Sequence, residues 1–464
     1  MGVHKTNWLH RLPWKLMILI ASYIFLGYHQ PLLHFGPISL PLPCVVLASS
    51  IVINYFFTHL MMKQAPGRAR QIVLACAIAV NVGILGYFKY RNFIIEQAHE
   101  VLSDSIALPR LSSLIIPIAI SFFTFQAISY LVDCYRGTIE KVSFLDFAVY
   151  LSFFPHLVAG PIVRASEFIP QMRNPHNARA VEGTRAATLI ARGLFKKMIV
   201  ADLLYTQLVR PAFGAPQKLG SLDAIMAVYG YAAQLYCDFS GYTDIAIGVA
   251  LLLGFRFPEN FNRPYTATSL RDFWQRWHMT LSRWLRDYVY IPLGGNKKSV
   301  FGARFVAFNL IATMTIGGLW HGANTTFVVW GFYMGMMLLV ERGLRNFNER
   351  HNIDVPAWVR RILTFHVVTF GWIIFASESM SNVRIMLERI FSGFSTPPTF
   401  ITASVVILIL CGIMIQSIPA SVTGRISTTI STKPIFAQAL IFGVGLMILS
   451  ALSGTVSAFV YGFF

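Results

Sequence analysis

The sequence predicts an all-α protein that crosses a membrane many times, and this prediction rests on composition and on segment length. Of its 464 residues, 55% are hydrophobic and 12% are charged, where a typical soluble protein has about 25% charged residues. Apolar segments of about 20 residues, the length of a transmembrane helix, recur along the whole chain. No soluble-looking block separates them, so we expect one membrane domain over residues 1–464.

Twelve apolar segments are long enough to enter a bilayer, which predicts roughly ten to twelve transmembrane or re-entrant helices. They begin near Leu16, Pro43, Ile72, Leu114, Phe144, Ala186, Ala224, Phe305, Thr325, Ile362, Ile401 and Ile435. The first lacks a small-residue cleavage site, so we expect a retained span rather than a signal peptide. Residues 144–160 and 224–254 are the most polar, and polar groups at membrane depth are tolerated where they are buried or line a cavity. We expect both segments to line the interior.

The formal net charge of +18 is better explained by membrane topology than by nucleic-acid binding. Basic residues gather between the apolar segments, at residues 63–70, 164–197, 256–304 and 342–361. Positively charged loops face the cytoplasm, where anionic headgroups attract them. We therefore expect a multi-pass protein that contacts membrane lipid, with its site reached from the cytoplasm.

The sequence predicts neither a disulfide framework nor a metal site. The five cysteines, Cys44, Cys76, Cys134, Cys237 and Cys411, are odd in number and widely spaced, and no histidine lies near them at ligand spacing. Walker A, dinucleotide-binding and HExxH motifs are absent from the sequence. No permanently bound cofactor is expected.

Residues 260–324 carry two histidines, His278 and His321, in strongly hydrophobic surroundings. A titratable imidazole at membrane depth is costly unless it is paired, so each is a candidate functional residue. Around the first, Phe273, Trp277, Leu281, Trp284 and Tyr288 recur at spacings of 4, 4, 3 and 4 and form an apolar stripe. This periodicity predicts one amphipathic interfacial helix over residues 271–290, with an arginine-rich face that includes Arg276. A turn at Pro292 and the following glycines ends it.

Several motifs together resemble the membrane-bound O-acyltransferase family, and in particular its alginate O-acetyltransferase (AlgI-type) branch. They are FFPHLVAGPIVR (153–164), QLYCDFSGYTDIAIG (234–248), ENFNRPY (259–265), FWQRWHMTLSRWLRDYVYIPLGGN (273–296) and GGLWHGAN (317–324). The resemblance implies helices around a central tunnel and acyl transfer from a cytoplasmic thioester to a hydroxyl on the far side. It places the catalytic histidine at His321 and the second family histidine at His278.

The chemistry of acyl transfer agrees with that placement. Moving an acetyl group from a thioester to an alcohol requires a base for the hydroxyl proton, and a desolvated histidine stays neutral near pH 7. The glycines that flank His321 would allow a close approach of backbone and substrate. The alternative for each histidine is a core residue whose ring nitrogens are satisfied by neighbours. For His278 three roles stay open: orienting His321, polarising the thioester carbonyl, or holding the segment by hydrogen bonding.

Further candidates for binding the donor or lining the tunnel are Asp238, Ser240, Tyr242, Arg276, Trp320 and Asn324. The alternative for the first three is mutual hydrogen bonding, together with Asp244, around a helix break at Gly241. For Trp320 the alternative is ordinary packing. The phosphates of a coenzyme A donor could be met by Arg271, Arg276, Arg283, Arg286, Lys297 and Lys298. His156 is expected to shape a broken helix, and the GxxxG formed by Gly331 and Gly335 is expected to pack closely on another helix.

These observations lead to one functional hypothesis and two alternatives. The hypothesis is an acetyltransferase in a bacterial inner membrane that takes acetyl from cytoplasmic acetyl-CoA for O-acetylation of an exported polysaccharide, such as alginate. By resemblance, delivery involves a separate periplasmic or extracellular acetyltransferase partner. The first alternative is D-alanyl transfer to teichoic acid from a carrier-protein thioester. The second is a non-catalytic transporter. Transporters often contain internal repeats, and the sequence shows none, which argues against this alternative.

Overall fold

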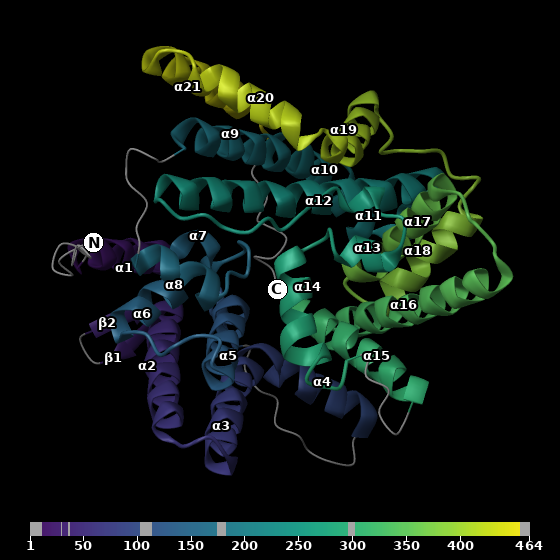
Figure 1. The fold of residues 1–464 in the computed structure, drawn as a ribbon. Helices are drawn as coiled ribbons and strands as arrows, with labels where there is room; N and C mark the ends of the chain where they lie inside the picture. Colours follow the sequence, from purple (N-terminus) through teal and green to yellow (C-terminus); the bar gives the residue numbers. More distant parts are fainter. Residues whose placement is uncertain are drawn as a thin grey trace. The chain divides into compact units, whose positions relative to one another are not determined.

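The computed structural model describes residues 12–28, 30–35, 38–102, 114–173, 182–295 and 302–454. The chain divides into two compact units, Met1–Arg179 and Ala180–Phe464. Both units are built from helices, as Figure 1 shows. The described residues depart from an all-α fold only in one antiparallel hairpin, which pairs Leu32 with Pro41 and Phe35 with Ile38.

The first unit contains the hairpin and the first eight α-helices. Its elements are α1 (Leu12–Gly27), β1 (Leu32–Phe35), β2 (Ile38–Pro41), α2 (Leu42–Lys63), α3 (Arg68–Leu85), the π-helical turn η2 (Gly86–Tyr90), α4 (Arg91–Leu102), α5 (Ile120–Arg136), α6 (Phe144–Ser152), α7 (Phe154–Leu157) and α8 (Ala165–Arg173). Buried Asn54 on α2 and Asn81 on α3 exchange amide hydrogen bonds of 3.1 and 2.7 Å. This polar pair fixes the register of the two helices, because each amide would otherwise be buried unsatisfied.

His156 is a core residue of the first unit. The helix predicted over residues 144–160 breaks at Phe153, as expected, and Pro155 lies in the first turn of α7. The His156 ring is fully buried among Phe153, Tyr150 and Phe168, and its Nε2 lies 3.1 Å from the Tyr150 carbonyl oxygen. Burial lowers the pKa of His156 to about 3, so its imidazole is neutral.

The second unit is organised around one long helix, α12 (Ser221–Leu252). The elements before it are α9 (Gly183–Leu194), η5 (Phe195–Ala201), α10 (Asp202–Leu204), η6 (Tyr205–Val209), α11 (Arg210–Gly214) and η7 (Pro216–Lys218). Those after it are η8 (Pro264–Thr266), α13 (Leu270–Trp274), α14 (Met279–Leu285), η9 (Arg286–Tyr290), α15 (Gly302–His321), α16 (Thr325–His351), α17 (Ala357–Ala376), α18 (Met380–Ser392), α19 (Ala403–Met414), η10 (Ile415–Ser417), α20 (Ala420–Ser431) and α21 (Ile435–Leu452).

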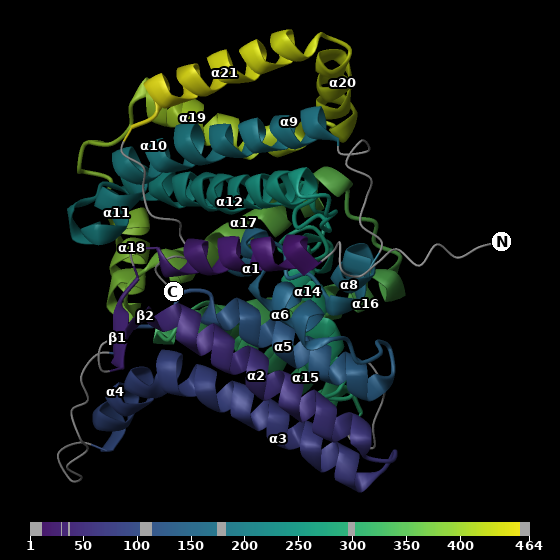
Figure 2. The same ribbon diagram turned by 90° about the vertical axis from the view of Figure 1, so that its left-hand side faces the viewer.

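Helix α12 runs without interruption through Gly241, so the helix break that was considered there as an alternative is absent. Figures 1 and 2 both show α9 lying along it. A Cβ on Gly241 would lie 2.8 Å from the Gly193 carbonyl oxygen of α9, and a Cβ on Gly248 would lie 2.9 Å from the Ala186 carbonyl oxygen. These glycines therefore serve close helix packing rather than a bend. Of the apolar window of α12, 72% is buried, which confirms the expected interior position.

The pair α15 and α16 is also packed through glycines. A Cβ on Gly331 would lie 2.5 Å from the Met314 carbonyl oxygen, and one on Gly335 would lie 2.9 Å from the Ile311 Cα. Gly318 on α15 faces the same seam, where a Cβ would collide with the Phe327 carbonyl oxygen. The GxxxG prediction is confirmed, and α15 ends at His321.

Among the described residues, six helical segments are long and apolar enough to span a membrane, or seven if a bent pair counts as one span. They are Leu42–Lys63, Arg68–His99, Ser221–Leu252, Thr325–His351, Ala357–Ala376 and Ile435–Leu452, with Ala403–Ser417 and Ser421–Ser431 as the bent pair. All twelve predicted apolar segments contain a helix. Fewer qualify as spans than the ten to twelve predicted, because helices such as α1, α6 and α9 are too short or are interrupted.

Candidate active site

The segment that carries His278 is a broken helix. Residues 271–290 form α13, α14 and the π-helical turn η9, with a break before Met279, so the prediction of one continuous helix is wrong. His278 occupies the break in the left-handed region, at φ 42° and ψ 52°. An earlier loop replaces the missing helical bonds: the Asn262 N–H donates to the Arg276 carbonyl at 2.9 Å, and the Met279 N–H donates to the Asn260 carbonyl at 2.9 Å. A non-glycine residue at positive φ is uncommon and often marks a functional site.

The His278 imidazole is enclosed in the protein, with 1% of its surface exposed. The Phe239 ring of α12 stands perpendicular to it at 4.7 Å, and the Trp320 ring lies 5.9 Å away. Its Nδ1 lies 3.1 Å from the Asn260 Oδ1. Burial lowers the pKa of His278 to about 3, because the charged imidazolium would lose its hydration. The ring is therefore neutral at physiological pH.

His321 is the last residue of α15 and is 4% exposed. Its ring is surrounded by aromatic rings: Trp320 at 5.1 Å, Phe375 at 5.2 Å and Trp330 at 5.4 Å. Trp320 therefore contacts both histidine rings. The structure brings the two predicted histidines to one aromatic cluster, although 43 positions separate them in the sequence.

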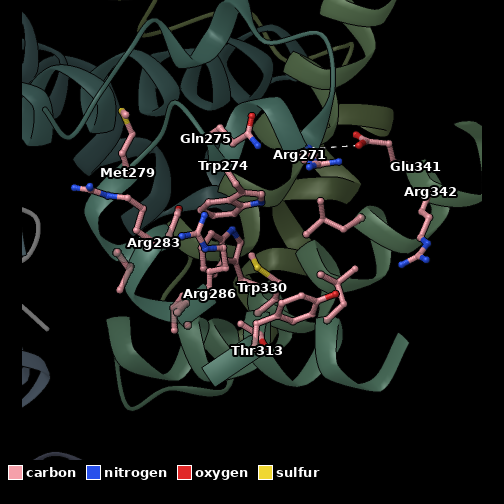
Figure 3. Close-up of a pocket in the computed structure, with 18 of the residues that line it drawn as sticks. Arg271, Trp274, Gln275, Met279, Arg283, Arg286, Thr313, Trp330, Glu341 and Arg342 are labelled. Atoms are coloured by element: carbon pink, nitrogen blue, oxygen red, sulfur yellow. Dashed lines mark hydrogen bonds between the residues drawn. The ribbon is translucent and has the colours of Figure 1, made fainter. Parts of the chain in front are cut away.

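A cavity of about 630 Å³ opens beside His321. Its walls come from α13, α14, η9, α15 and α16 and are mainly apolar, with Trp274 and Trp330 near its centre (Figure 3). The lining residues are Arg271, Trp274, Gln275, Met279, Leu281, Ser282, Arg283, Leu285, Arg286, Tyr290, Leu310, Thr313, Met314, Gly317, His321, Trp330, Leu338, Glu341, Arg342 and Arg345. Its volume falls within the range of about 300–1,000 Å³ that is typical of small-molecule sites. His321 is the histidine that faces this space.

Five arginines line the cavity: Arg271, Arg283, Arg286, Arg342 and Arg345. Two of them have acidic neighbours, since Arg286 pairs with Asp287 at 2.7 Å and Arg345 with Glu349 at 3.8 Å. In Figure 3, Arg283 and Arg286 lie on one side of the cavity and Arg342 lies on the other. Guanidinium groups gathered around an apolar cavity offer binding partners for phosphate or carboxylate groups.

The acidic residue in the lining is Glu341, and its carboxylate is hydrogen-bonded to backbone N–H groups. Its carboxylate accepts hydrogen bonds from the N–H groups of Leu270 and Arg271, which caps the N-terminus of α13. The cavity therefore carries an excess of positive charge.

The predicted phosphate-binding set is partly found in this cavity. Arg271, Arg283 and Arg286 line it, whereas the Arg276 guanidinium turns to Asp272 at 2.6 Å and does not. Lys297 and Lys298 lie outside the described residues. Sequence reasoning missed Arg342 and Arg345, which follow the apolar part of α16 at a spacing of three and so share a helix face.

The polar residues of α12 lie in an ion-pair network with α9 and η5 and do not line this cavity. Lys197 bridges Asp238 at 2.7 Å and Asp202 at 2.8 Å, while Lys196 donates to Ser240 at 3.0 Å. The Arg192 guanidinium and the Lys196 ammonium both reach the Asp244 carboxylate. Asp238, Ser240 and Asp244 therefore have partners on α9 and η5. Tyr242 is likewise outside the cavity lining.

Two other candidates have identifiable local contacts. Asn324 caps α16: its Oδ1 accepts from the Thr326 N–H at 3.0 Å, and its Nδ2 donates to the Glu378 carbonyl at 2.8 Å. Trp320 packs between the histidines and is not part of the cavity lining. A tunnel role for Asn324 or Trp320 stays a prediction. Among the described residues, no group of three or more His, Cys, Asp or Glu side chains could hold a metal ion.

The helices, the aromatic cluster around two histidines and the arginine-lined cavity together define a helical membrane protein with a candidate acyl-transfer site. The chain belongs to the membrane-bound O-acyltransferase family, whose model matches residues 118–381. It is therefore a multi-pass membrane enzyme of the O-acyltransferase class. The match covers His278, His321 and the whole cavity lining.

The chain is similar to bacterial proteins that are named as O-acetylases, O-acetyltransferases or D-alanyltransferases. A probable alginate O-acetylase of Pseudomonas aeruginosa is 39% identical over 383 residues, which cover 82% of this chain and 70% of the relative. A peptidoglycan O-acetyltransferase of Helicobacter pylori is 35% identical over 401 residues, covering 81% and 73%. A teichoic acid D-alanyltransferase of Bacillus subtilis is 29% identical over 279 residues, covering 56% and 69%.

Proposed function

We propose that this protein is an O-acetyltransferase of the bacterial inner membrane. It takes acetyl from acetyl-CoA on the cytoplasmic side and passes it through a protein-lined tunnel for O-acetylation of an exported polysaccharide. The observation that carries this proposal is the position of His321 on the wall of an arginine-rich cavity of about 630 Å³. Similarity to O-acetylases over 81–82% of the chain supports acetyl as the group transferred.

The cavity supports a coenzyme A donor because of its charge and its walls. Coenzyme A carries several phosphates on a nucleotide and an uncharged pantetheine arm that ends in the thioester. Arginines bind phosphate groups through short charge-assisted hydrogen bonds, and apolar walls suit the pantetheine arm. Five arginines exceed what the single phosphate of a carrier-protein prosthetic group would need, which favours a free nucleotide donor.

The reaction can be written with His321 as the base. The acceptor hydroxyl gives its proton to a ring nitrogen of His321 while its oxygen attacks the thioester carbonyl carbon. The new C–O bond forms and the C–S bond breaks. The proton on the imidazolium then passes to the leaving thiolate, which restores the neutral histidine. Negative charge develops on the carbonyl oxygen, and the positive cavity beside His321 stabilises it.

Residues other than His321 also contribute to the proposed site. His278 is the second histidine of the site, and Trp320 holds both rings in one aromatic cluster. No fixed cofactor is needed, since the donor brings the activated acyl group. Asp238, Ser240, Tyr242, Arg276 and Asn324 stay candidates for contacts elsewhere along the acyl path.

The acceptor is proposed from the names of the relatives. An exported polysaccharide such as alginate is the first candidate, reached through a periplasmic or extracellular acetyltransferase partner. A cell-wall glycan is the second, because the Helicobacter pylori relative is named a peptidoglycan O-acetyltransferase. In both cases the acetyl group ends on a sugar hydroxyl outside the cytoplasm.

Inverted membrane vesicles test the donor and the direction of transfer together. Acetyl-CoA labelled in the acetyl group is supplied outside the vesicles, at the former cytoplasmic face, and label is measured in the enclosed glycan. We expect incorporation that depends on this protein. Label from a D-alanyl carrier-protein thioester, with none from acetyl-CoA, would support D-alanyl transfer instead. Solute passage without consumption of any thioester would support the transporter alternative.

A further inference from the structure

Asn260 lies at the centre of a buried hydrogen-bond cluster around His278. The Asn260 side chain is 1% exposed, and its Oδ1 accepts three hydrogen bonds. The donors are the Thr280 hydroxyl at 2.8 Å, the His278 Nδ1 at 3.1 Å and the Thr280 backbone N–H at 3.2 Å. The Asn260 carbonyl also accepts from the Met279 N–H. One residue therefore bonds to three consecutive positions at the helix break.

The backbone donor settles how the Asn260 amide is oriented. A peptide N–H can only donate, so the atom that faces the Thr280 N–H must be the amide oxygen rather than the NH₂ group. A flipped amide would bring two donors together in a site without water access. The group that meets His278 Nδ1 is therefore an acceptor.

The orientation of Asn260 in turn sets the tautomer of His278. An oxygen acceptor at 3.1 Å requires a proton on Nδ1, since a bare nitrogen there would face the oxygen lone pairs. A second proton on Nε2 would make the imidazolium, which the burial of the ring disfavours. Nε2 then carries a lone pair, and it has no hydrogen-bond partner among the described residues.

We propose that Asn260 is a positioning residue that holds His278 in the Nδ1–H tautomer and so keeps Nε2 as an acceptor in the aromatic cluster that His278 shares with His321. The inference rests on the proposed function for the role of Nε2 in the reaction. It excludes one of the three roles left open for His278. A neutral ring with a bare Nε2 cannot donate to a thioester carbonyl, so polarising that carbonyl is excluded. Nε2 is left as an acceptor of a hydrogen bond or a proton, on a ring that shares its Trp320 contact with His321 and does not itself line the cavity.

The backbone at the break supports a role beyond local folding. His278 adopts a left-handed conformation that is sterically costly for a residue with a Cβ. A glycine at this position would remove the strain, whereas the histidine keeps a ring that packs against Phe239 and Trp320. The surrounding bonds from Asn260 hold that ring in one orientation.

The first experiment reads the tautomer directly in the full-length protein. Histidine labelled with ¹⁵N is incorporated, and the His278 signals are assigned by their loss in His278→Gln. We expect a protonated Nδ1 and an unprotonated Nε2 in the wild type, and a changed protonation pattern in Asn260→Ala. A wild-type ring protonated on Nε2 overturns the proposal. This readout needs no substrate, so it stands even if the acetyl-CoA assay shows no transfer.

The second experiment measures acyl transfer in vesicles across pH. Asn260→Ala should reduce the rate about 10–100-fold, as the loss of partners that orient functional histidines does elsewhere. Asn260→Asp keeps the acceptor and adds a charge that stabilises the imidazolium, so the acid limb of its pH–rate profile should move to higher pH. Asn262→Ala is the matched control, because its exposed side chain belongs to the same loop and only its backbone N–H bonds across the break.

Each outcome of the second experiment bears on the proposal. An unshifted acid limb in Asn260→Asp, or a full rate in Asn260→Ala, contradicts it. If Asn260→Ala does not accumulate in the membrane, the proposal is tested by the Asn260→Asp variant instead, through the tautomer of His278 and the pH–rate profile. Loss of transfer in Asn262→Ala to the same extent would show that the loop as a whole is needed for folding and would also contradict a specific role for Asn260.

Discussion

Removal of Arg342 and Arg345 together should weaken the binding of coenzyme A to the purified protein. Both arginines lie on α16, both line the cavity, and both are exposed to solvent at its mouth. A donor phosphate bound by them would therefore interact through a largely aqueous medium rather than a dry one. Substitution by alanine removes the charge and leaves the closely packed part of α16, around Gly331 and Gly335, unchanged.

The size of the effect follows from that exposure. Two unit charges about 4 Å apart in water interact by about 1 kcal/mol. This corresponds to about a fivefold change in the dissociation constant for each arginine. Summed without coupling between the two arginines, these contributions predict that Arg342→Ala/Arg345→Ala raises the Kd about 30-fold. Higher salt should shrink the difference, because the Debye length at 0.1 M is about 10 Å.

Equilibrium binding of coenzyme A at two ionic strengths is the assay, and Arg350→Ala is the control. Arg350 is an exposed arginine near the end of the same helix and does not line the cavity. The control should bind like the wild type. Equal weakening in the control and the double variant would mean that net charge alone matters. An unchanged Kd in the double variant would refute phosphate binding by these residues.

Three further predictions concern the framework of the site. Gly318→Ala should destabilise the protein by about 1–3 kcal/mol through overpacking at the α15–α16 seam, whereas Gly343→Ala on the open side of α16 should not, as thermal unfolding would show. His278 has a pKa of about 3 when folded and about 6.5 when unfolded, so the stability from its neutral ring is present above pH 6.5 and is lost as pH falls toward 3. The loss is about 2 kcal/mol at pH 5, and His278→Gln should flatten the decline of the melting temperature between pH 7 and pH 5. Lys197→Met leaves buried carboxylates without their cation and should cost about 3–5 kcal/mol, while Lys218→Met at an exposed position should cost little; equal melting temperatures would contradict the network.

The positions of the helices could be predicted from the sequence because apolarity over about 20 residues is a local signal. The break at His278 could not. Its flanking residues repeat at helical spacing, and the bonds that open the helix come from Asn260 and Asn262, more than a dozen positions earlier. Local periodicity carries no information about a competing hydrogen-bond donor or acceptor from another segment.

The residues of the site differ in how well the sequence predicts them, because local sequence does not show which distant residues become partners. The two histidines stood out because titratable groups are rare in apolar surroundings. The polar residues of α12 stood out equally, but their partners Arg192, Lys196 and Lys197 lie about 40–50 positions away, and only the fold pairs them. Arg342 and Arg345 gave no signal, since arginines that follow an apolar helix usually mark its cytoplasmic end.

Replacing His321 is the most direct test of the central claim that this residue is the base for acyl transfer. In cells that make the acetylated glycan, His321→Gln should lower the ester content about 100-fold or more, in line with the loss of a general base, at an unchanged protein level. His351→Gln, an exposed histidine at the end of α16, should leave it unchanged. Wild-type ester content in His321→Gln would contradict the claim.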